Sequence, residues 1–221
     1  MIESILPDGA VAVDTFVDPP AATLFPEEAA LVERAVVKRR LEFATARWCA
    51  RRAMAELGRP PTPVLRGERG EPLWPAGLVG SLTHCAGYRG AVLARREAFA
   101  TIGIDAEPDE PLPEGVFETI TRPEERPRID ELLRTHPSVC WDRLLFSAKE
   151  SVYKAWFPLT SRWLGFEEAD VVIDPVAGTF RARLLATGGR VNGGGLTGFD
   201  GRWMAGPGLV LTAVAVPAVQ P

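Results

Sequence analysis

The predicted elements of this chain follow an order, a helix and then strands, that occurs twice. Residues 26–57 are predicted to be helical, with a break near Val36, because a proline and two glutamates open the segment and Gly58 closes it. Strand-like runs follow at residues 90–94 and 101–105, which we expect to be two strands of one sheet. A second helix at residues 141–156 precedes strand-like runs at residues 170–173, 179–185, 201–205 and 209–216. This order predicts an α+β fold with antiparallel sheets.

Composition restricts the classes of protein that the chain can belong to. Its 221 residues, 46% of them hydrophobic, suffice for one sizeable core or for two small cores that share an interface. A formal net charge of −4 argues against a general nucleic-acid binder, which is normally basic. Three widely spaced cysteines predict reduced thiols rather than a disulfide framework or a zinc cluster. No apolar run is long enough to span a membrane, so we expect a soluble, cytoplasmic monomer that binds neither membrane nor nucleic acid.

The second predicted helix carries a compact group of charged side chains. Glu150 and Lys154 are four residues apart and therefore neighbours on one face, while Lys149 is about 100° round the helix from Glu150. Taken alone, such a group is ordinarily a solvated surface worth roughly a few tenths of a kcal/mol.

A second group of acidic residues lies at the end of a predicted strand. Residues 101–107 alternate as the end of a strand, so Asp105 and Glu107 point to the same face. Two adjacent carboxylates raise each other's pKa unless a cation lies between them. Oxygen ligands of this kind suit Mg²⁺, which completes its shell with water and substrate phosphate oxygens, and Glu150 is the candidate third ligand.

Three motifs together resemble those of a known family. Residues 103–107 (GIDAE) and 146–154 (FSAKESVYK) resemble the paired signature of the Sfp-type 4′-phosphopantetheinyl transferases. Residues 74–88 (WPAGLVGSLTHCAGY) resemble the branch typified by the enterobactin-synthase transferase and the mycobacterial enzyme. The resemblance implies two similar α/β halves with antiparallel sheets, related by a pseudo-twofold axis, with the active site in the seam. With an acidic, proline-rich hinge after Glu107, we expect these halves at residues 1–107 and 108–221.

The resemblance also assigns roles to residues that bind coenzyme A. Positions matching Arg39 and Arg47 grip its phosphates in similar enzymes, and a planar guanidinium suits that task. Arg66 is a further phosphate or adenosine contact. The turn at Ser81, Thr83 and His84 offers hydroxyl, imidazole and backbone donors for a phosphate, with His84 at the 3′-phosphate or diphosphate. Other basic residues of the first helix, such as Arg51 and Arg52, keep the ordinary reading of a solvated face.

The implied reaction transfers the 4′-phosphopantetheine group of coenzyme A to a serine hydroxyl of an acyl or peptidyl carrier protein and releases 3′,5′-ADP. Mg²⁺, or Mn²⁺, would lie between the diphosphate and Asp105, Glu107 and Glu150. Glu150 is the expected base, directly or through a water, and Lys149 would balance the leaving diphosphate. Lys154 is either a second phosphate contact or a partner that positions Glu150.

Several alternatives stay open at this point. The same acidic triad would serve a Mg²⁺-dependent hydrolase of coenzyme A or another nucleotide diphosphate. A non-catalytic coenzyme A binding protein is a further alternative. Carriers of fatty-acid, polyketide and peptide synthesis, including siderophore synthesis, are equally possible substrates. An aromatic stretch at residues 156–166 is either core or the lining of a pantetheine channel or carrier groove.

Overall fold

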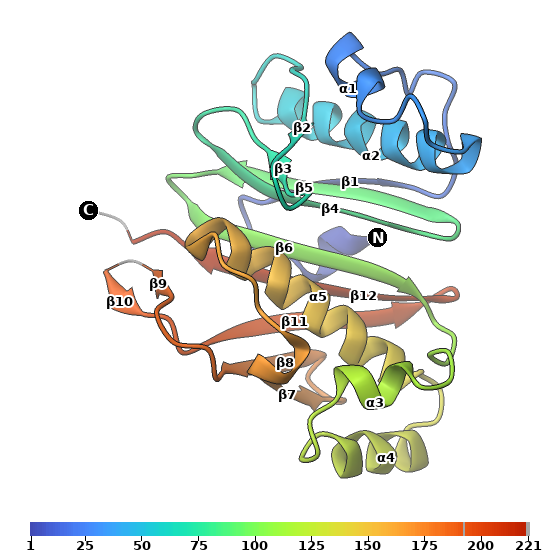
Figure 1. Ribbon diagram of the computed structural model, residues 1–221, viewed down its shortest axis with the longest axis vertical. Coiled ribbons are helices and arrows are strands. Elements are labelled where there is room, and N and C mark those ends of the chain that lie inside the picture. The colour runs from blue at the N-terminus through green and yellow to red at the C-terminus, as the bar shows by residue number, and fades with distance from the viewer. Residues whose placement is uncertain (192, 220–221) are drawn as a thin grey trace.

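The computed structural model describes residues 1–191 and 193–219, which form two large sheets, each packed against one long helix, and two small two-stranded sheets (Figure 1). The first half contains, in chain order, η1 (Ile2–Ile5), β1 (Val11–Thr15), α1 (Pro26–Ala30), α2 (Val37–Glu56), β2 (Leu65–Arg66), β3 (Pro72–Leu73), β4 (Leu78–Cys85) and β5 (Tyr88–Arg95). The second contains β6 (Phe99–Pro108), α3 (Val116–Ile120), α4 (Arg126–Thr135), α5 (Trp141–Thr160), η2 (Phe166–Glu168), β7 (Ala169–Asp174), β8 (Thr179–Leu184), β9 (Arg190–Val191), β10 (Gly194–Gly195), β11 (Gly198–Gly206) and β12 (Leu209–Pro217).

The first half is a three-stranded antiparallel sheet in the order β1-β5-β4, with α2 on one face (Figure 1). Small residues of α2, including Ala50 and Ala53, are fully buried against Ala91 and Leu93 of β5, so helix and sheet approach closely. The predicted helical segment is interrupted before Val37, where α2 begins, which confirms the expected break near Val36.

The second half is a five-stranded antiparallel sheet in the order β6-β12-β11-β8-β7, with α5 across one face (Figure 1). Its core joins apolar residues of α5 to the inward-facing residues of the strands, and the ring of Trp141 meets that of Trp203 edge-on at a centroid distance of 5.0 Å. The four strand-like runs predicted after the second helix are confirmed as β7, β8, β11 and β12. The α+β prediction with antiparallel sheets is therefore also confirmed.

Strands β5 and β6 lie in different sheets, so the prediction that they share one is wrong. Strand β6 pairs with β12 along its whole length, and this places residues 99–108 with the second half. By sheet membership the halves divide between β5 and β6 rather than after Glu107. The physical reason is the long, apolar β12, which the proline-rich stretch after residue 107 could not reveal.

Side-chain hydroxyls join the two sheets where β4 meets β6. The backbone N–H of Ile104 donates to Ser81 Oγ at 3.1 Å, and that of Ala106 donates to Thr83 Oγ1 at 2.9 Å. These bonds take the place of a strand ladder, since β4 and β6 are not paired. The sheets are thus held edge to edge along the seam.

Helix α5 lies directly on β6 because the strand carries a glycine there. A Cβ at Gly103 would collide with the carbonyl oxygen of Ser151 and the amide nitrogen of Ala155. Thr101 Oγ1 donates to the Ala155 carbonyl at 3.0 Å and adds a polar tie. Asp105 and Glu107, which alternate with the buried Ile104 and Ala106 on the same strand, therefore share the face of Gly103 towards α5.

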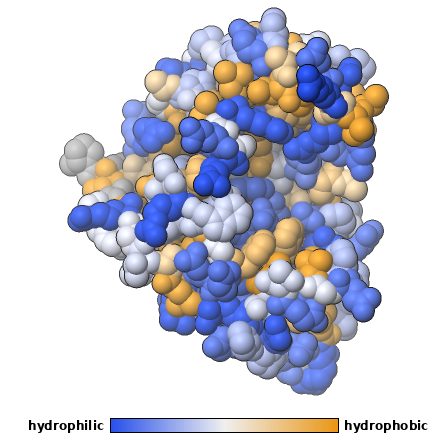
Figure 2. All heavy atoms as spheres, viewed as in Figure 1, coloured by the Kyte–Doolittle hydropathy of each residue, from blue (hydrophilic) through white to orange (hydrophobic). Residues whose placement is uncertain are grey.

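The molecular surface is mostly hydrophilic on the face drawn in Figure 2 and recedes between the α2 half and the α5 half. Within the described residues, none of the helices combines the length and the apolar character needed to cross a membrane. All three cysteines, Cys49, Cys85 and Cys140, are free thiols.

Candidate active site

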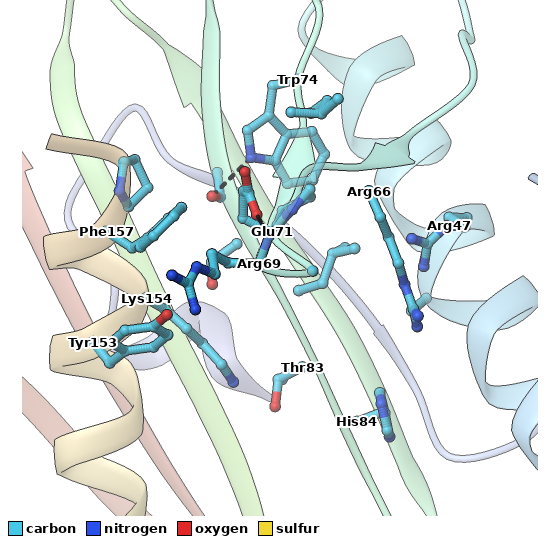
Figure 3. A pocket seen from close by; sticks show the side chains of 18 of the residues that line it. Arg47, Arg66, Arg69, Glu71, Trp74, Thr83, His84, Tyr153, Lys154 and Phe157 are labelled. Carbon is cyan, nitrogen blue, oxygen red and sulfur yellow. Dashed lines mark hydrogen bonds between the residues drawn. The ribbon is translucent and has the colours of Figure 1, made fainter. Parts of the chain in front are cut away.

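A pocket of about 520 Å³ opens in the seam between α2, β4 and the second half of α5. Figure 3 shows Arg47 of α2 and Arg66 of β2 side by side on one wall, with Tyr153, Lys154 and Phe157 of α5 on the other. Eight of the residues predicted from sequence line it: Arg39, Arg47, Arg66, Ser81, Thr83, His84, Glu150 and Lys154. Residues far apart in the chain thus meet at one place.

The wall next to α2 concentrates positive charge around one aromatic ring. The guanidinium carbon of Arg47 lies 3.2 Å from the ring centroid of Phe43, and that of Arg66 lies 4.9 Å from it. Burial, partly offset by Glu28 and reinforced by Arg66, lowers the pKa of Arg47 to about 9. Burial and then the charge of Arg39 lower the pKa of Arg66. The cations remain charged at neutral pH but repel one another, so an anion in the pocket would relieve that repulsion.

His84 is held as a neutral imidazole beside these arginines. Its Nε2 is 2.5 Å from Nη1 of Arg39, and because a guanidinium only donates, Nε2 is the acceptor and the ring proton is assigned to Nδ1. Glu42 Oε2 lies 3.7 Å from that Nδ1. Burial first, and then the charges of Arg39 and Lys154, lower the pKa of His84 to about 4.

The hydroxyls of Ser81 and Thr83 lie at the pocket but already serve the seam. Both side chains are buried, and each oxygen accepts a backbone N–H of β6. Thr83 Oγ1 is also 3.5 Å from Asp105 Oδ1. Their hydroxyls therefore shape the floor of the pocket and align Asp105 below it.

Three carboxylates interact electrostatically on the α5 side of the seam. Asp105 Oδ1 pairs with Lys154 Nζ at 2.6 Å, and its Oδ2 is buried without a hydrogen-bond partner. Burial and then Asp105 raise the pKa of Glu107 to about 7, against the opposing charge of Arg143. Burial also raises the pKa of Glu150. The positive charge of Lys154 opposes this rise, and the negative charge of Asp105 adds to it. Burial is thus the main reason why Glu107 and Glu150 ionise less readily than exposed glutamates, and the charge of Asp105 adds to it.

The donor set of this cluster fits a divalent cation with oxygen ligands. The orphaned Oδ2 of Asp105 is an acceptor with nothing to accept from, and Mg²⁺ takes carboxylate oxygens of this kind. Over residues 1–191 and 193–219 no three acidic, histidine or cysteine side chains converge closely enough to form a ready-made metal site. Two cations lie among the carboxylates in the structure: the ammonium of Lys154 pairs with Asp105, and the guanidinium of Arg143 pairs with Glu107.

Lys149 does not reach the pocket, contrary to its predicted role at the leaving diphosphate. Its ammonium is buried, 2.7 Å from Glu125 Oε2, and donates to the carbonyls of Phe166 at 2.8 Å and Ala169 at 3.0 Å. Lys149 lies about 100° round the helix from Glu150, and these three partners hold its ammonium on the side of α5 away from the pocket. The structure makes Lys149 a packing contact between α5, α4 and β7.

Further residues line the pocket. Phe157 belongs to the aromatic stretch for which core and channel lining were both left open, and it does line the pocket, whereas Trp156 is fully buried. Arg69, Glu71, Trp74 and Tyr153 were not predicted as lining residues. Arg69, Glu71 and Trp74 come from the loop between β2 and β4, and the Trp74 indole N–H donates to the Gly80 carbonyl at 2.9 Å. Tyr153 and Phe157 follow Glu150 by three and seven residues, so projecting α5 as a helix would have found them. The exposed Trp163 packs on Tyr153 with ring centroids 5.0 Å apart, at the same edge of the pocket.

Arg51 and Arg52, which were predicted to lie on a solvated face of α2, both stay out of the pocket, but the prediction is wrong for the solvation of Arg51, whose side chain is only 12% exposed. Arg51 donates to the buried carboxylate of Glu28, at 2.9 Å to Oε2. The guanidinium carbon of Arg52 lies over the ring of Trp48 at 5.0 Å from its centroid.

Comparison with known proteins gives matches along nearly the whole chain. A family model described as the 4′-phosphopantetheinyl transferase N-terminal domain matches residues 27–94, and one described as the 4′-phosphopantetheinyl transferase superfamily matches residues 101–192. The 4′-phosphopantetheinyl transferase Svp of Streptomyces mobaraensis is 57% identical over 99% of this chain and 90% of its own length. The 4′-phosphopantetheinyl transferase PptT of Mycobacterium tuberculosis is 50% identical over 98% of each chain. Enterobactin synthase component D of Salmonella typhimurium is 37% identical over 54% of this chain and 49% of its own.

Proposed function

Because this chain belongs to the 4′-phosphopantetheinyl transferase superfamily, whose members use coenzyme A as substrate and act on carrier proteins, we propose that the seam pocket is where it carries out that reaction. The observation that carries the assignment is a single cavity with clustered arginines on one wall and with Glu150 and Lys154 on the other. Lys154 connects this wall to Asp105, which does not itself line the cavity. Such a cavity suits a substrate that carries a nucleotide phosphate at one end and a reacting diphosphate at the other.

The basic wall would bind the nucleotide end of coenzyme A. Arg39, Arg47 and Arg66 supply planar donors for phosphate oxygens, and an approaching phosphate offsets their mutual repulsion. His84 lies against Arg39 and would contact the same phosphates. Ser81 and Thr83 would contribute by shaping the floor and through their hydroxyl protons.

Asp105, Glu107 and Glu150 would hold a divalent cation, Mg²⁺ or Mn²⁺, whose chemistry when bound is to neutralise the diphosphate and the charge that grows on its bridging oxygen. The support in this chain is the partnerless Oδ2 of Asp105 together with the raised pKa values of Glu107 and Glu150. Lys154, which pairs with Asp105 and lines the pocket, would balance the charge on the 5′-phosphate of the departing 3′,5′-ADP, the role first expected of Lys149.

The bond changes balance with Glu150 as base. The carrier serine Oγ forms a bond to the β-phosphorus as the bond from that phosphorus to the bridging oxygen breaks, and 3′,5′-ADP leaves with that oxygen. The serine proton passes to Glu150, directly or through a water. The raised pKa of Glu150, caused mainly by burial, makes it a stronger base than an exposed glutamate.

The acceptor would be an acyl or peptidyl carrier protein that meets a monomer of this chain. Carrier domains are acidic, so we propose that they dock on basic or apolar surface at the pocket's edge. The pantetheine arm would run along Tyr153, Phe157 and Trp163, which form an aromatic edge there. Free thiols fit action in a reducing compartment, which we propose is the cytoplasm.

The test is the intact mass of an apo carrier protein after incubation with this chain, coenzyme A and Mg²⁺, with and without EDTA. We expect a gain of one phosphopantetheine group that chelator abolishes and Glu150→Gln strongly slows. No gain on fatty-acid, polyketide and peptidyl carriers, with coenzyme A still bound, would overturn the proposal. Release of phosphopantetheine without any carrier would instead identify a hydrolase.

A further inference from the structure

Arg143 connects the acidic cluster to the loop that follows it. It lies in the first turn of α5, and its Nη1 donates to Glu107 Oε2 at 3.1 Å. Its Nε donates to the Glu110 carbonyl at 3.0 Å and its Nη2 to the Pro111 carbonyl at 2.9 Å. One rigid guanidinium thus fixes three points of the chain at once, which a flexible ammonium could not do.

The loop behind this contact is tied down independently. Leu112 N donates to Asp142 Oδ2 at 2.8 Å, and Cys140 N donates to Asp109 Oδ1 at 2.8 Å. The start of α5 and residues 109–112 therefore form one hydrogen-bonded unit. Arg143 is the part of this unit that reaches a carboxylate of the cluster.

The contact leaves Glu107 half engaged. Arg143 occupies Oε2, while no hydrogen bond to Oε1 is found anywhere in the part of the chain that the structure describes. The side chains of Arg143 and Glu107 are only 15% and 19% exposed, so the pair is shielded from solvent. A carboxylate pinned by one oxygen presents the other in a restricted direction, which is the arrangement that a supporting residue gives a metal ligand.

Arg143, like Asp105 and Glu107, does not line the pocket, and its Nε, Nη1 and Nη2 all donate to other parts of the chain rather than towards the cavity. It precedes Glu150 by seven residues, so both side chains project from nearly the same face of α5. One helix thus supplies a predicted ligand, Glu150, and the group that orients a second, Glu107.

We propose that Arg143 is a positioning residue that orients the Glu107 carboxylate for the divalent cation and thereby sets the affinity of the cluster for that cation. The proposal rests on the proposed function, in which Glu107 is a ligand. In this role Arg143 contacts neither the reacting atoms nor the nucleotide and acts only through Glu107.

The experiment measures Mn²⁺ affinity of the purified protein by electron paramagnetic resonance, with Mn²⁺ alone and no carrier. Loss of an orienting partner typically weakens metal binding about 10- to 100-fold, and we expect a loss in that range for Arg143→Met. Arg143→Lys keeps the charge but only one donor centre, so it should fall between wild type and Arg143→Met. Because Arg143 acts through Glu107, adding Arg143→Met to Glu107→Gln should cause little further loss.

Two controls separate orientation from general loosening. Asp142→Ala removes the neighbouring tie to Leu112 and leaves the Arg143 to Glu107 contact, so it should bind Mn²⁺ as wild type does. The affinity of every variant for 3′,5′-ADP without metal should stay near that of wild type, which reports a folded basic wall.

Each outcome decides something. Unchanged Mn²⁺ affinity in Arg143→Met or Arg143→Lys that binds 3′,5′-ADP normally overturns the proposal, and so does an equal loss in Asp142→Ala. Full additivity with Glu107→Gln shows that Arg143 does not act through Glu107. A wild-type protein that binds no Mn²⁺ would instead refute the proposed metal ligands, and the inference with them.

Discussion

Replacement of Glu107 by glutamine should change how the stability of the metal-free protein depends on pH. Relative to wild type, the variant should become more stable as the pH rises. The pKa of Glu107 is about 7 in the folded protein against a usual value of 4.5, because burial and Asp105 disfavour its charged form. For a group whose pKa is higher in the folded state, the contribution to stability is complete below the usual pKa and is lost as pH rises through the folded pKa. Wild type should therefore lose stability between about pH 4.5 and pH 7, and glutamine, which does not ionise, should not.

The magnitude follows from the same shift. Each pKa unit corresponds to about 1.4 kcal/mol, so linkage from pH 5 to pH 8 gives a relative gain of about 2.5 kcal/mol for Glu107→Gln. In a chain of this size 1 kcal/mol moves the melting temperature by about 2–4 °C, which predicts a gap that widens by about 5–10 °C. The charge-dependent part of the contact with Arg143 is already contained in that pKa, because the guanidinium opposes the upward shift, so its loss needs no separate correction to this difference.

The assay is thermal and urea unfolding of both proteins in EDTA, at half-unit steps from pH 5 to pH 8. Glu97→Gln, at an exposed carboxylate between β5 and β6, is the matched control and should parallel wild type throughout. Saturating Mg²⁺ at pH 8 should stabilise wild type more than Glu107→Gln, since the cation relieves the repulsion that glutamine has already removed. Parallel pH profiles for wild type and Glu107→Gln would refute the coupling of Glu107 to its acidic neighbours.

Three further outcomes are expected. Gly103→Ala should destabilise the fold by about 1–3 kcal/mol, seen as a lower melting temperature, because a Cβ there meets the backbone of α5. Lys149→Met alone should cost about 3–5 kcal/mol by stranding the buried Glu125, and the double variant Lys149→Met, Glu125→Leu should recover most of it in urea unfolding; no recovery would contradict a packing role. Arg66→Ala should weaken binding of 3′,5′-ADP about 10- to 100-fold by calorimetry, whereas Arg52→Ala, outside the pocket, should not.

Local patterns in the sequence predicted most of the elements. The break before α2 followed from a helical segment too long for one helix, and the strands after α5 followed from short apolar runs between turns. The order in which the strands pair could not be predicted from these local patterns. Consecutive β5 and β6 were expected to pair, but β6 pairs with β12, more than a hundred residues later, because the long apolar β12 offers a partner that no local pattern reveals.

The site was predictable to the extent that its residues carry motifs. The basic wall, His84, Glu150 and Lys154 meet in one pocket, as expected from the resemblance. The error at Lys149 arose because adjacent residues on a helix point about 100° apart, and only tertiary packing decides which of the two is buried. Arg143 was missed although it shares the face of Glu150. Its role depends on contact with Glu107, and the sequence does not show that the strand with Glu107 lies beside this part of α5.

The charge balance of the seam explains why Lys154 lies where it does. Coupled carboxylates in a partly buried site must be protonated, repel one another or find a cation, and Lys154 Nζ, 2.6 Å from Asp105 Oδ1, is that cation. Across the pocket the arginines face the converse problem, because their mutual repulsion is only partly offset by Glu28 near Arg47 and by Glu42, 3.9 Å from Arg39. In the proposed function, a substrate diphosphate would answer both, because it would supply anions to the arginines and attract Lys154, while a divalent cation would replace Lys154 beside the carboxylates. Metal and nucleotide should therefore bind cooperatively, because each would reduce the electrostatic repulsion that opposes binding of the other.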